Sequence, residues 1–95
     1  MVEGITKSGI KFSIDENIKD YINLMLLLAE VQDVKSSAQD KLVATKDLLW
    51  LIFGNSRDAV YGFTNEVYKI HGNRSADTIV AELNDMFDAL NAKNS

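Results

Sequence analysis

Apolar and polar residues alternate near the start of the chain, the period-two pattern of a strand with one buried face. The apolar positions of this segment are Ile10, Phe12 and Ile14. Ser8 and Gly9 are suited to a two-residue turn, which would place Ile5 opposite Phe12 on the same face. The pattern predicts a β-hairpin over residues 3–14. We expect it to lie against helices or to pair with another chain, because an isolated hairpin is marginally stable.

The following segment has helical spacing but is apolar on two sides. We predict a helix over residues 17–34, capped by Asp15 or Asn17. One apolar stripe consists of Ile18, Tyr21, Ile22, Met25, Leu28 and Ala29. A second stripe, on roughly the opposite side, consists of Leu24, Leu27, Val31 and Val34. A helix with two apolar sides is either central in the fold or shared with a partner.

Three further helices are predicted over residues 40–53, 56–70 and 76–92, after a polar loop at residues 35–39. Their capping residues are Gly54, Asn55 or Ser56, Gly72 and Ser75. The helix at 40–53 ends in six consecutive apolar residues that include Trp50. The expected core stripe of the helix at 56–70 is Ala59, Val60, Phe63, Val67 and Ile70, with Tyr61 and Tyr68 on its other side. That of the helix at 76–92 is Ala76, Ile79, Val80, Leu83, Met86, Phe87 and Leu90.

These elements define a mostly α, four-helix compact domain with a short N-terminal β-hairpin. The chain of 95 residues is long enough for one domain, and its 46% hydrophobic content is enough to build a core. The side chains expected at the centre of that core are Leu49, Phe53, Phe63, Val67, Leu83 and Phe87.

Charge and composition exclude several classes of protein. A net charge of −4 without a basic stripe argues against nucleic-acid binding. The absence of cysteine excludes disulfides and thiolate sites. The longest apolar run, residues 24–29, is too short to span a membrane, and the first residues do not have the pattern of a secretory signal. We therefore expect a soluble protein of the cytoplasm.

Candidate chemistry is sparse, and we expect neither a catalytic centre nor a cofactor or metal site. His71, the single histidine, is suited to stabilising the end of a helix. The carboxylates of the last helix are expected mostly on its outward side, as a solvated face rather than an acidic contact patch: Asp77, Glu82, Asp85 and Asp88. Asp15 and Glu16 are better explained by helix capping than by cation binding, and residues 72–75 lack the glycine spacing of a phosphate loop.

The unusual feature is a surplus of apolar surface. The candidate partner-binding residues are Leu24, Leu27, Val31, Val34, Trp50, Tyr61 and Tyr68. One interpretation is a tightly packed bundle in which the second helix is central and covers one surplus stripe. The other is that part of this surface is an interface, because monomers rarely expose large apolar patches and because tyrosine and tryptophan are frequent in binding hot spots.

Three segments together resemble a known family. They are GIKFSIDEN at residues 9–17, LLWLIFG at 48–54, and GNRS at 72–75 followed by Ile79, Glu82-Leu83 and Met86-Phe87. In spacing and hydrophobicity they resemble the tail assembly chaperones of long-tailed bacteriophages and prophages of Gram-positive bacteria. The resemblance covers residues 9–90. Residues 33–46 and the order of Asn73 and Arg74 depart from the family's pattern.

The resemblance implies a small, mostly helical and non-enzymatic protein, and the surplus apolar surface predicts that it forms dimers or higher oligomers. Such a protein coats the tape-measure protein, keeps its apolar helices soluble and helps to recruit tail-tube subunits. The alternative is a small helical interaction or regulatory module with another partner. A small enzyme or ligand-binding bundle is a third hypothesis, which would require a polar pocket with convergent titrating groups.

Overall fold

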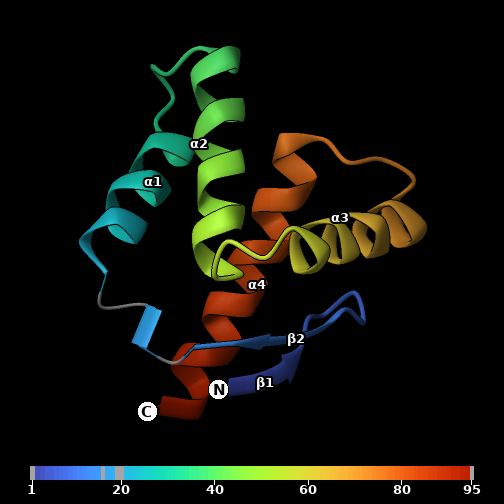
Figure 1. Cartoon of the computed structure of the whole chain (residues 1–95). Helices are drawn as coiled ribbons and strands as arrows, with labels where there is room; N and C mark the ends of the chain where they lie inside the picture. Colours follow the sequence, from blue (N-terminus) through green and yellow to red (C-terminus); the bar gives the residue numbers. More distant parts are fainter. Residues whose placement is uncertain (1, 16, 19–20, 95) are drawn as a thin grey trace.

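The elements follow the predicted order in a computed structural model that describes residues 2–15, 17–18 and 21–94. Strands β1 (Val2–Ile5) and β2 (Lys11–Ile14) form an antiparallel hairpin. The helices are α1 (Ile22–Gln32), α2 (Ala38–Ile52), α3 (Arg57–His71) and α4 (Ala76–Asn94), as Figure 1 shows. The prediction of a mostly helical domain with an N-terminal hairpin is confirmed.

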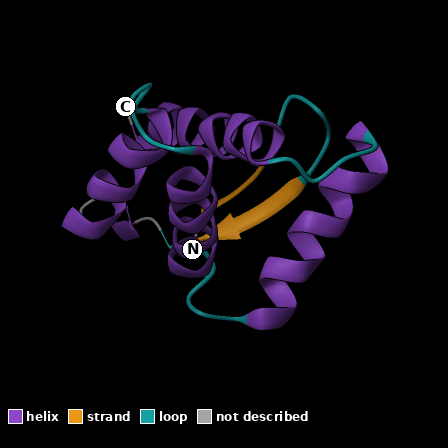
Figure 2. Cartoon of the chain, turned by 90° about the horizontal axis from the view of Figure 1, so that it is seen from above, coloured by secondary structure: helices purple, strands orange, loops and turns teal. Residues whose placement is uncertain are grey.

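Helix α4 is the longest helix and contacts α2, α3 and β1. Helices α1 and α2 form an antiparallel pair beside it, and α3 projects away from the lower end of α2 (Figure 1). The view from above shows the hairpin beneath the helices (Figure 2). The hairpin is therefore part of the single core of the domain rather than an appendage.

The core combines side chains from both strands and all four helices. Of the six residues predicted at its centre, Leu49, Phe63, Val67 and Leu83 are buried. Phe53 and Phe87 are partly buried and pack against the core, and the ring centroids of Phe53 and Phe63 are 5.3 Å apart. The hairpin contributes Val2, Ile10, Phe12 and Ile14. The side chain of Leu90 lies outside the described part of the chain.

The register of the hairpin differs from the prediction by one residue. Phe12 lies opposite Gly4, and Ile5 lies opposite Lys11 on the exposed face. The reason is a three-residue loop in place of the predicted two-residue turn. The Thr6 amide donates to the Ile10 carbonyl at 2.9 Å, and Gly9 has a φ of 98°. A glycine with positive φ at the third loop position is typical of such hairpins. Because side chains alternate between faces, this shift of one moves Ile5 out of the core.

Helix α1 begins at Ile22, five residues later than predicted. The Asp15 carboxylate accepts from the Asn17 amide at 2.9 Å, and the Asp15 carbonyl accepts from the Ile18 amide at 3.1 Å. Asp15 therefore caps a separate short turn, which places Ile18 in the core, and the side chain at the N-cap position of α1, Tyr21, makes no capping hydrogen bond. The helix also ends two residues early, at Gln32, because the Asp33 side chain accepts from the Lys35 amide in the next turn.

The other helix boundaries follow from their capping residues. Ser37, Ser56 and Ser75 accept hydrogen bonds from backbone amides three residues ahead, which satisfies a free N–H in each first turn. At the end of α2, the amides of Gly54 and Asn55 donate to the carbonyls of Leu51 and Trp50 in a Schellman motif. The prediction that Gly54 and Gly72 end helices is confirmed, because both have a positive φ.

Candidate protein-binding surface

Helix α1 is apolar on two sides, as predicted, but the side expected to be surplus is the one that is buried. Leu24 and Val31, expected on the surplus stripe, are buried against the rest of the domain. They are buried because α2 packs against that side of α1. The exposed side of α1 consists instead of Ile22, Met25, Leu26 and Ala29, with Leu26 at the edge nearest α2. We call these four residues the α1 stripe.

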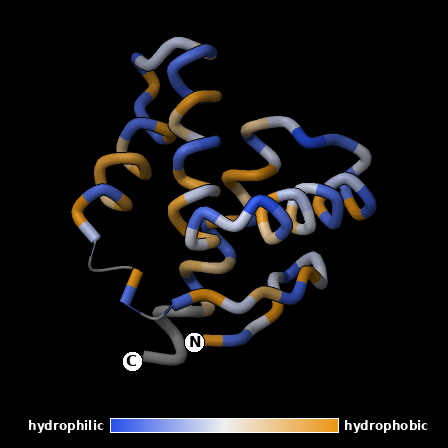
Figure 3. The backbone as a smooth tube through the Cα atoms, viewed as in Figure 1, coloured by the Kyte–Doolittle hydropathy of each residue, from blue (hydrophilic) through white to orange (hydrophobic). Residues whose placement is uncertain are grey.

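The α1 stripe has the geometry of a helix interface. Its positions are spaced at i, i+3, i+4 and i+7, so the four side chains form one row. Met25 and Leu26 are 59% and 62% exposed, and Glu30 is the single charged residue of α1. Figure 3 shows hydrophobic colouring on the side of α1 away from α2 as well as on the side facing it. The stripe is a continuous uncharged apolar surface in contact with solvent.

A groove between α1 and α2 extends this surface. Its apolar walls are formed by Leu26 and Leu27 of α1 and by Trp50 and Leu51 of α2. The polar residues around it are Asn23, Asp47 and Asn55. Since Leu26 belongs both to the α1 stripe and to the groove, the two form one surface. Two of the predicted partner-binding residues, Leu27 and Trp50, therefore lie together at this site.

The remaining candidates lie elsewhere. Val34 is 88% exposed in the turn after α1 and is not part of the α1 stripe. Tyr61 and Tyr68 are half-exposed and share one side of α3, seven residues apart. Each carries an arginine over its ring: the Arg57 Cζ lies 5.1 Å from the Tyr61 centroid, and the Arg74 Cζ lies 4.4 Å from that of Tyr68. The seven candidates therefore do not form one site. Two are buried, two line the groove, one is isolated, and two lie beside arginines on one side of α3: Leu24 and Val31, Leu27 and Trp50, Val34, and Tyr61 and Tyr68, respectively.

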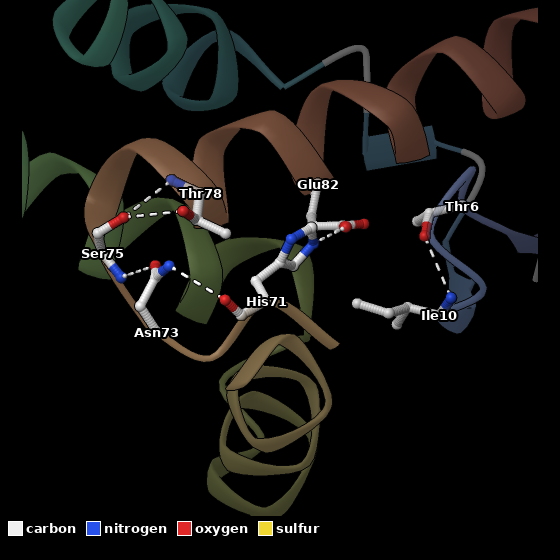
Figure 4. Close-up of polar contacts among 7 residues, drawn as sticks. All are labelled: Thr6, Ile10, His71, Asn73, Ser75, Thr78 and Glu82. Atoms are coloured by element: carbon white, nitrogen blue, oxygen red, sulfur yellow. Dashed lines mark hydrogen bonds and ion pairs between the residues drawn. The ribbon is translucent and has the colours of Figure 1, made fainter. Parts of the chain in front are cut away.

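The main polar contact of the interior joins the end of α3 to α4. The His71 Nε2 and the Glu82 Oε1 are 2.6 Å apart, and Glu82 is 2% exposed (Figure 4). The prediction that Glu82 lies on the outward side of α4 is wrong. Asp77 and Asp88 are exposed as predicted, whereas Asp85 is half-buried, 3.9 Å from the Lys7 Nζ. His71 lies in the last turn of α3, and its pairing with the Glu82 carboxylate was not predicted.

Opposing effects set the ionisation of Glu82. Burial raises the pKa of its carboxyl group, but the hydrogen bond with His71, the neighbouring hydroxyl groups of Ser8 and Thr6 and the electrostatic influence of His71 together lower the pKa by a larger amount. The net pKa lies below the ordinary value of 4.5, so this carboxyl group is ionised at neutral pH. No described group lies within hydrogen-bonding distance of its Oε2 atom. The pair joins the end of α3 to α4.

The pair does not form a catalytic triad within the described part of the chain. In a nucleophilic triad the histidine lies between the carboxylate and a hydroxyl group. Here the hydroxyl groups of Ser8 and Thr6 lie instead on the side of Glu82, where they lower its pKa.

Two further segments that could have carried chemistry are used for capping. Glu16 lies outside the described residues, so the expected capping role of Asp15 and Glu16 is seen only at Asp15. At residues 72–75, Asn73 and Ser75 are used to cap α4 (Figure 4).

Comparison with protein families, curated proteins and solved structures finds no match to this chain. Among the described residues, none of the helices is long and apolar enough to cross a membrane. The apolar surface formed by the α1 stripe and the α1/α2 groove is the feature that points to a function.

Proposed function

We propose that this protein is a non-enzymatic assembly chaperone of phage tails, which acts in the cytoplasm of the bacterial host. Its client is the tape-measure protein, whose apolar helices it coats and keeps soluble, and it helps to recruit tail-tube subunits. The resemblance of residues 9–90 motivates the choice of client. The observation that supports it is the uncharged α1 stripe, which continues into a groove with aromatic and aliphatic walls.

This surface matches the requirement for binding apolar helices. A helix laid along a groove places its i, i+3, i+4 and i+7 side chains against it, and the α1 stripe has the same spacing. An uncharged stripe imposes little sequence specificity, which suits a client with many similar helical segments. Trp50 supplies a large, partly exposed ring to the wall of the groove.

The proposal is tested by co-expression with a tape-measure fragment that is insoluble alone. Wild-type protein is expected to bring the fragment into the soluble fraction and to co-purify with it. Leu26→Glu places a charge where the α1 stripe meets the groove and should abolish this effect. Val34→Glu adds the same charge at an exposed residue outside the stripe and should retain it. Equal rescue by both variants, or no rescue by wild-type protein, would refute the proposed site.

The position of the gene provides an independent test. A tail assembly chaperone is expected to be encoded between the tail-tube gene and a very long tape-measure gene. If the gene lies elsewhere and the α1 surface binds an unrelated protein, the chain is a helical interaction module instead.

A further inference from the structure

A second groove lies between α2 and the start of α4. Its apolar walls include Leu42, Val43 and Leu49 of α2 and Ile79 of α4. Leu42 and Val43 are exposed although both are large and apolar. This α2/α4 groove shares no lining residue with the α1/α2 groove. The α1/α2 and α2/α4 grooves are therefore separate sites.

The two grooves differ in charge. The charged residues lining the α2/α4 groove are Lys46 and Arg74, and no carboxylate lines it. The charged residue lining the α1/α2 groove is Asp47. The chain as a whole has a net charge of −4, but this apolar groove is bordered by two cations and no carboxylate. The groove therefore attracts anionic groups more strongly than the rest of the surface does. It favours an apolar ligand that carries negative charge.

Arg74 lines this groove, and its guanidinium group is held in position by two residues of α3. Its guanidinium group lies over the Tyr68 ring, with Cζ 4.4 Å from the ring centroid, and its Nη2 donates to the Asn65 Oδ1 at 2.9 Å. Among the described residues it forms no ion pair with a carboxylate. Stacking and one hydrogen bond restrain the side chain, while its other N–H donors remain free. A guanidinium held in this way is suited to binding a carboxylate through two hydrogen bonds.

We propose that the α2/α4 groove binds an amphipathic helical segment of another protein that carries glutamate or aspartate beside its apolar stripe. The apolar side chains would contact Leu42, Val43 and Ile79, and a carboxylate would bind Arg74. This site is separate from the α1 surface and does not depend on the function proposed above.

The chain contains a matched control for Arg74. Arg57, the other arginine of the chain, also lies over a tyrosine, with its Cζ 5.1 Å from the Tyr61 centroid, and also lacks an ion pair among the described residues. It does not line the α2/α4 groove. Replacing either arginine removes one positive charge and one stacked guanidinium, but only the loss of Arg74 changes the groove.

The test uses two fluorescent helical peptides of about 18 residues with the same leucine stripe. One peptide has glutamates flanking the stripe, and the other has lysines at the same positions. Fluorescence anisotropy should show that wild-type protein binds the glutamate peptide about tenfold more tightly than the lysine peptide. Arg74→Ala should weaken binding of the glutamate peptide about tenfold, whereas Arg57→Ala should leave it unchanged. The preference for the glutamate peptide should persist in Leu26→Glu, which removes binding of either peptide at the α1 surface. Circular dichroism checks that each variant is folded.

Equal affinity for the two peptides in both wild-type and Leu26→Glu protein would overturn the proposal. Equal losses in Arg74→Ala and Arg57→Ala would show a general charge effect and would also overturn it. A wild-type dimer in sedimentation equilibrium that is lost in Arg74→Ala but not in Arg57→Ala would assign the groove to self-association instead and overturn the proposal. Leu26→Glu separates the sites, because it should abolish client binding at the α1 surface and spare this groove.

Discussion

A single glycine allows the hairpin to close over the core. A Cβ atom built on Gly4 would lie 2.6 Å from the Cζ of the Phe12 ring, which is directly opposite on the other strand. The Phe12 ring thus occupies the space that a side chain at Gly4 would fill. We expect Gly4→Ala to lower the free energy of unfolding by about 1–3 kcal/mol, because the buried ring must move. Urea denaturation followed by circular dichroism measures this change.

Gly62 is the control for this substitution. It lies within α3, has no positive φ, and a Cβ atom built on it contacts nothing within 4 Å. Gly62→Ala should raise stability by up to about 1 kcal/mol, since alanine favours a helix over glycine. If Gly4→Ala were neutral or stabilising, close packing of Phe12 against this strand would be contradicted.

Glu82 should make stability depend on pH in the acidic range. Its pKa is lowered in the folded protein relative to 4.5, so the unfolded chain binds more protons and the contribution of Glu82 is lost as the pH falls through the folded pKa. Urea midpoints from about pH 6 to about pH 3 should show the advantage of wild-type protein over Glu82→Gln shrinking. Asp88→Asn is the control, because it removes an exposed carboxylate. A difference between wild-type and Glu82→Gln that is constant over this range would contradict the pairing with His71.

The sequence contained a signal for the burial of Glu82 that the charge pattern obscured. Glu82 lies three residues after Ile79 and four before Met86, both of which are buried, so helical spacing places it on the core side of α4. A carboxylate on the core side needs a partner. The partner, His71, is eleven residues away, and pairing requires the chain to reverse after α3. The left-handed conformation at Gly72 begins this reversal.

At the scale of the elements, the helices with a good cap were predicted to within two residues. Ser37, Ser56 and Ser75 each satisfy a backbone amide locally, so these starts depend on nearby sequence alone. Helix α1 was extended too far because Asp15 caps a different turn and because Tyr21 provides no side-chain cap. The register of the hairpin was predicted wrongly for a similar reason. The three-residue loop is closed by Thr6, which is buried and whose hydroxyl oxygen accepts from the Ile10 amide.

Helix α4 should depend strongly on its core stripe. Leu83 is fully buried at the centre of that stripe, between Ile79 and Met86. Leu83→Ala should lower the free energy of unfolding by about 2–5 kcal/mol through lost burial and the cavity left behind. The adjacent Asn84 is half-buried, and Asn84→Ala is the control, expected to change stability by about 0.5 kcal/mol or less. A thermal midpoint that is unchanged in Leu83→Ala would place this residue outside the core.

At the scale of the whole molecule, the sequence indicated surplus apolar surface but not its location. Both stripes of α1 are apolar, so local spacing cannot decide which of them faces α2. That choice is made by the remote contacts of α2 with α4 and α3, which fix the side on which α1 can pack. Phe63, Val67 and Leu83 were predictable as core residues because each lies on the main apolar stripe of its helix, α3 or α4. The interface residues were not, because α1 has two apolar stripes.

The exposed α1 stripe leads to the last prediction, that the chain self-associates in the absence of a client. Two copies related by a two-fold axis would bring the same stripe together, and its lack of charge avoids like-charge repulsion across the axis. Sedimentation equilibrium should show a dimer or higher oligomer whose population increases with concentration. Met25→Glu places two charges near the axis and should shift the population to monomer without unfolding, whereas Val34→Glu should not. A strictly monomeric wild-type protein at high concentration would mean that the stripe does not bind itself.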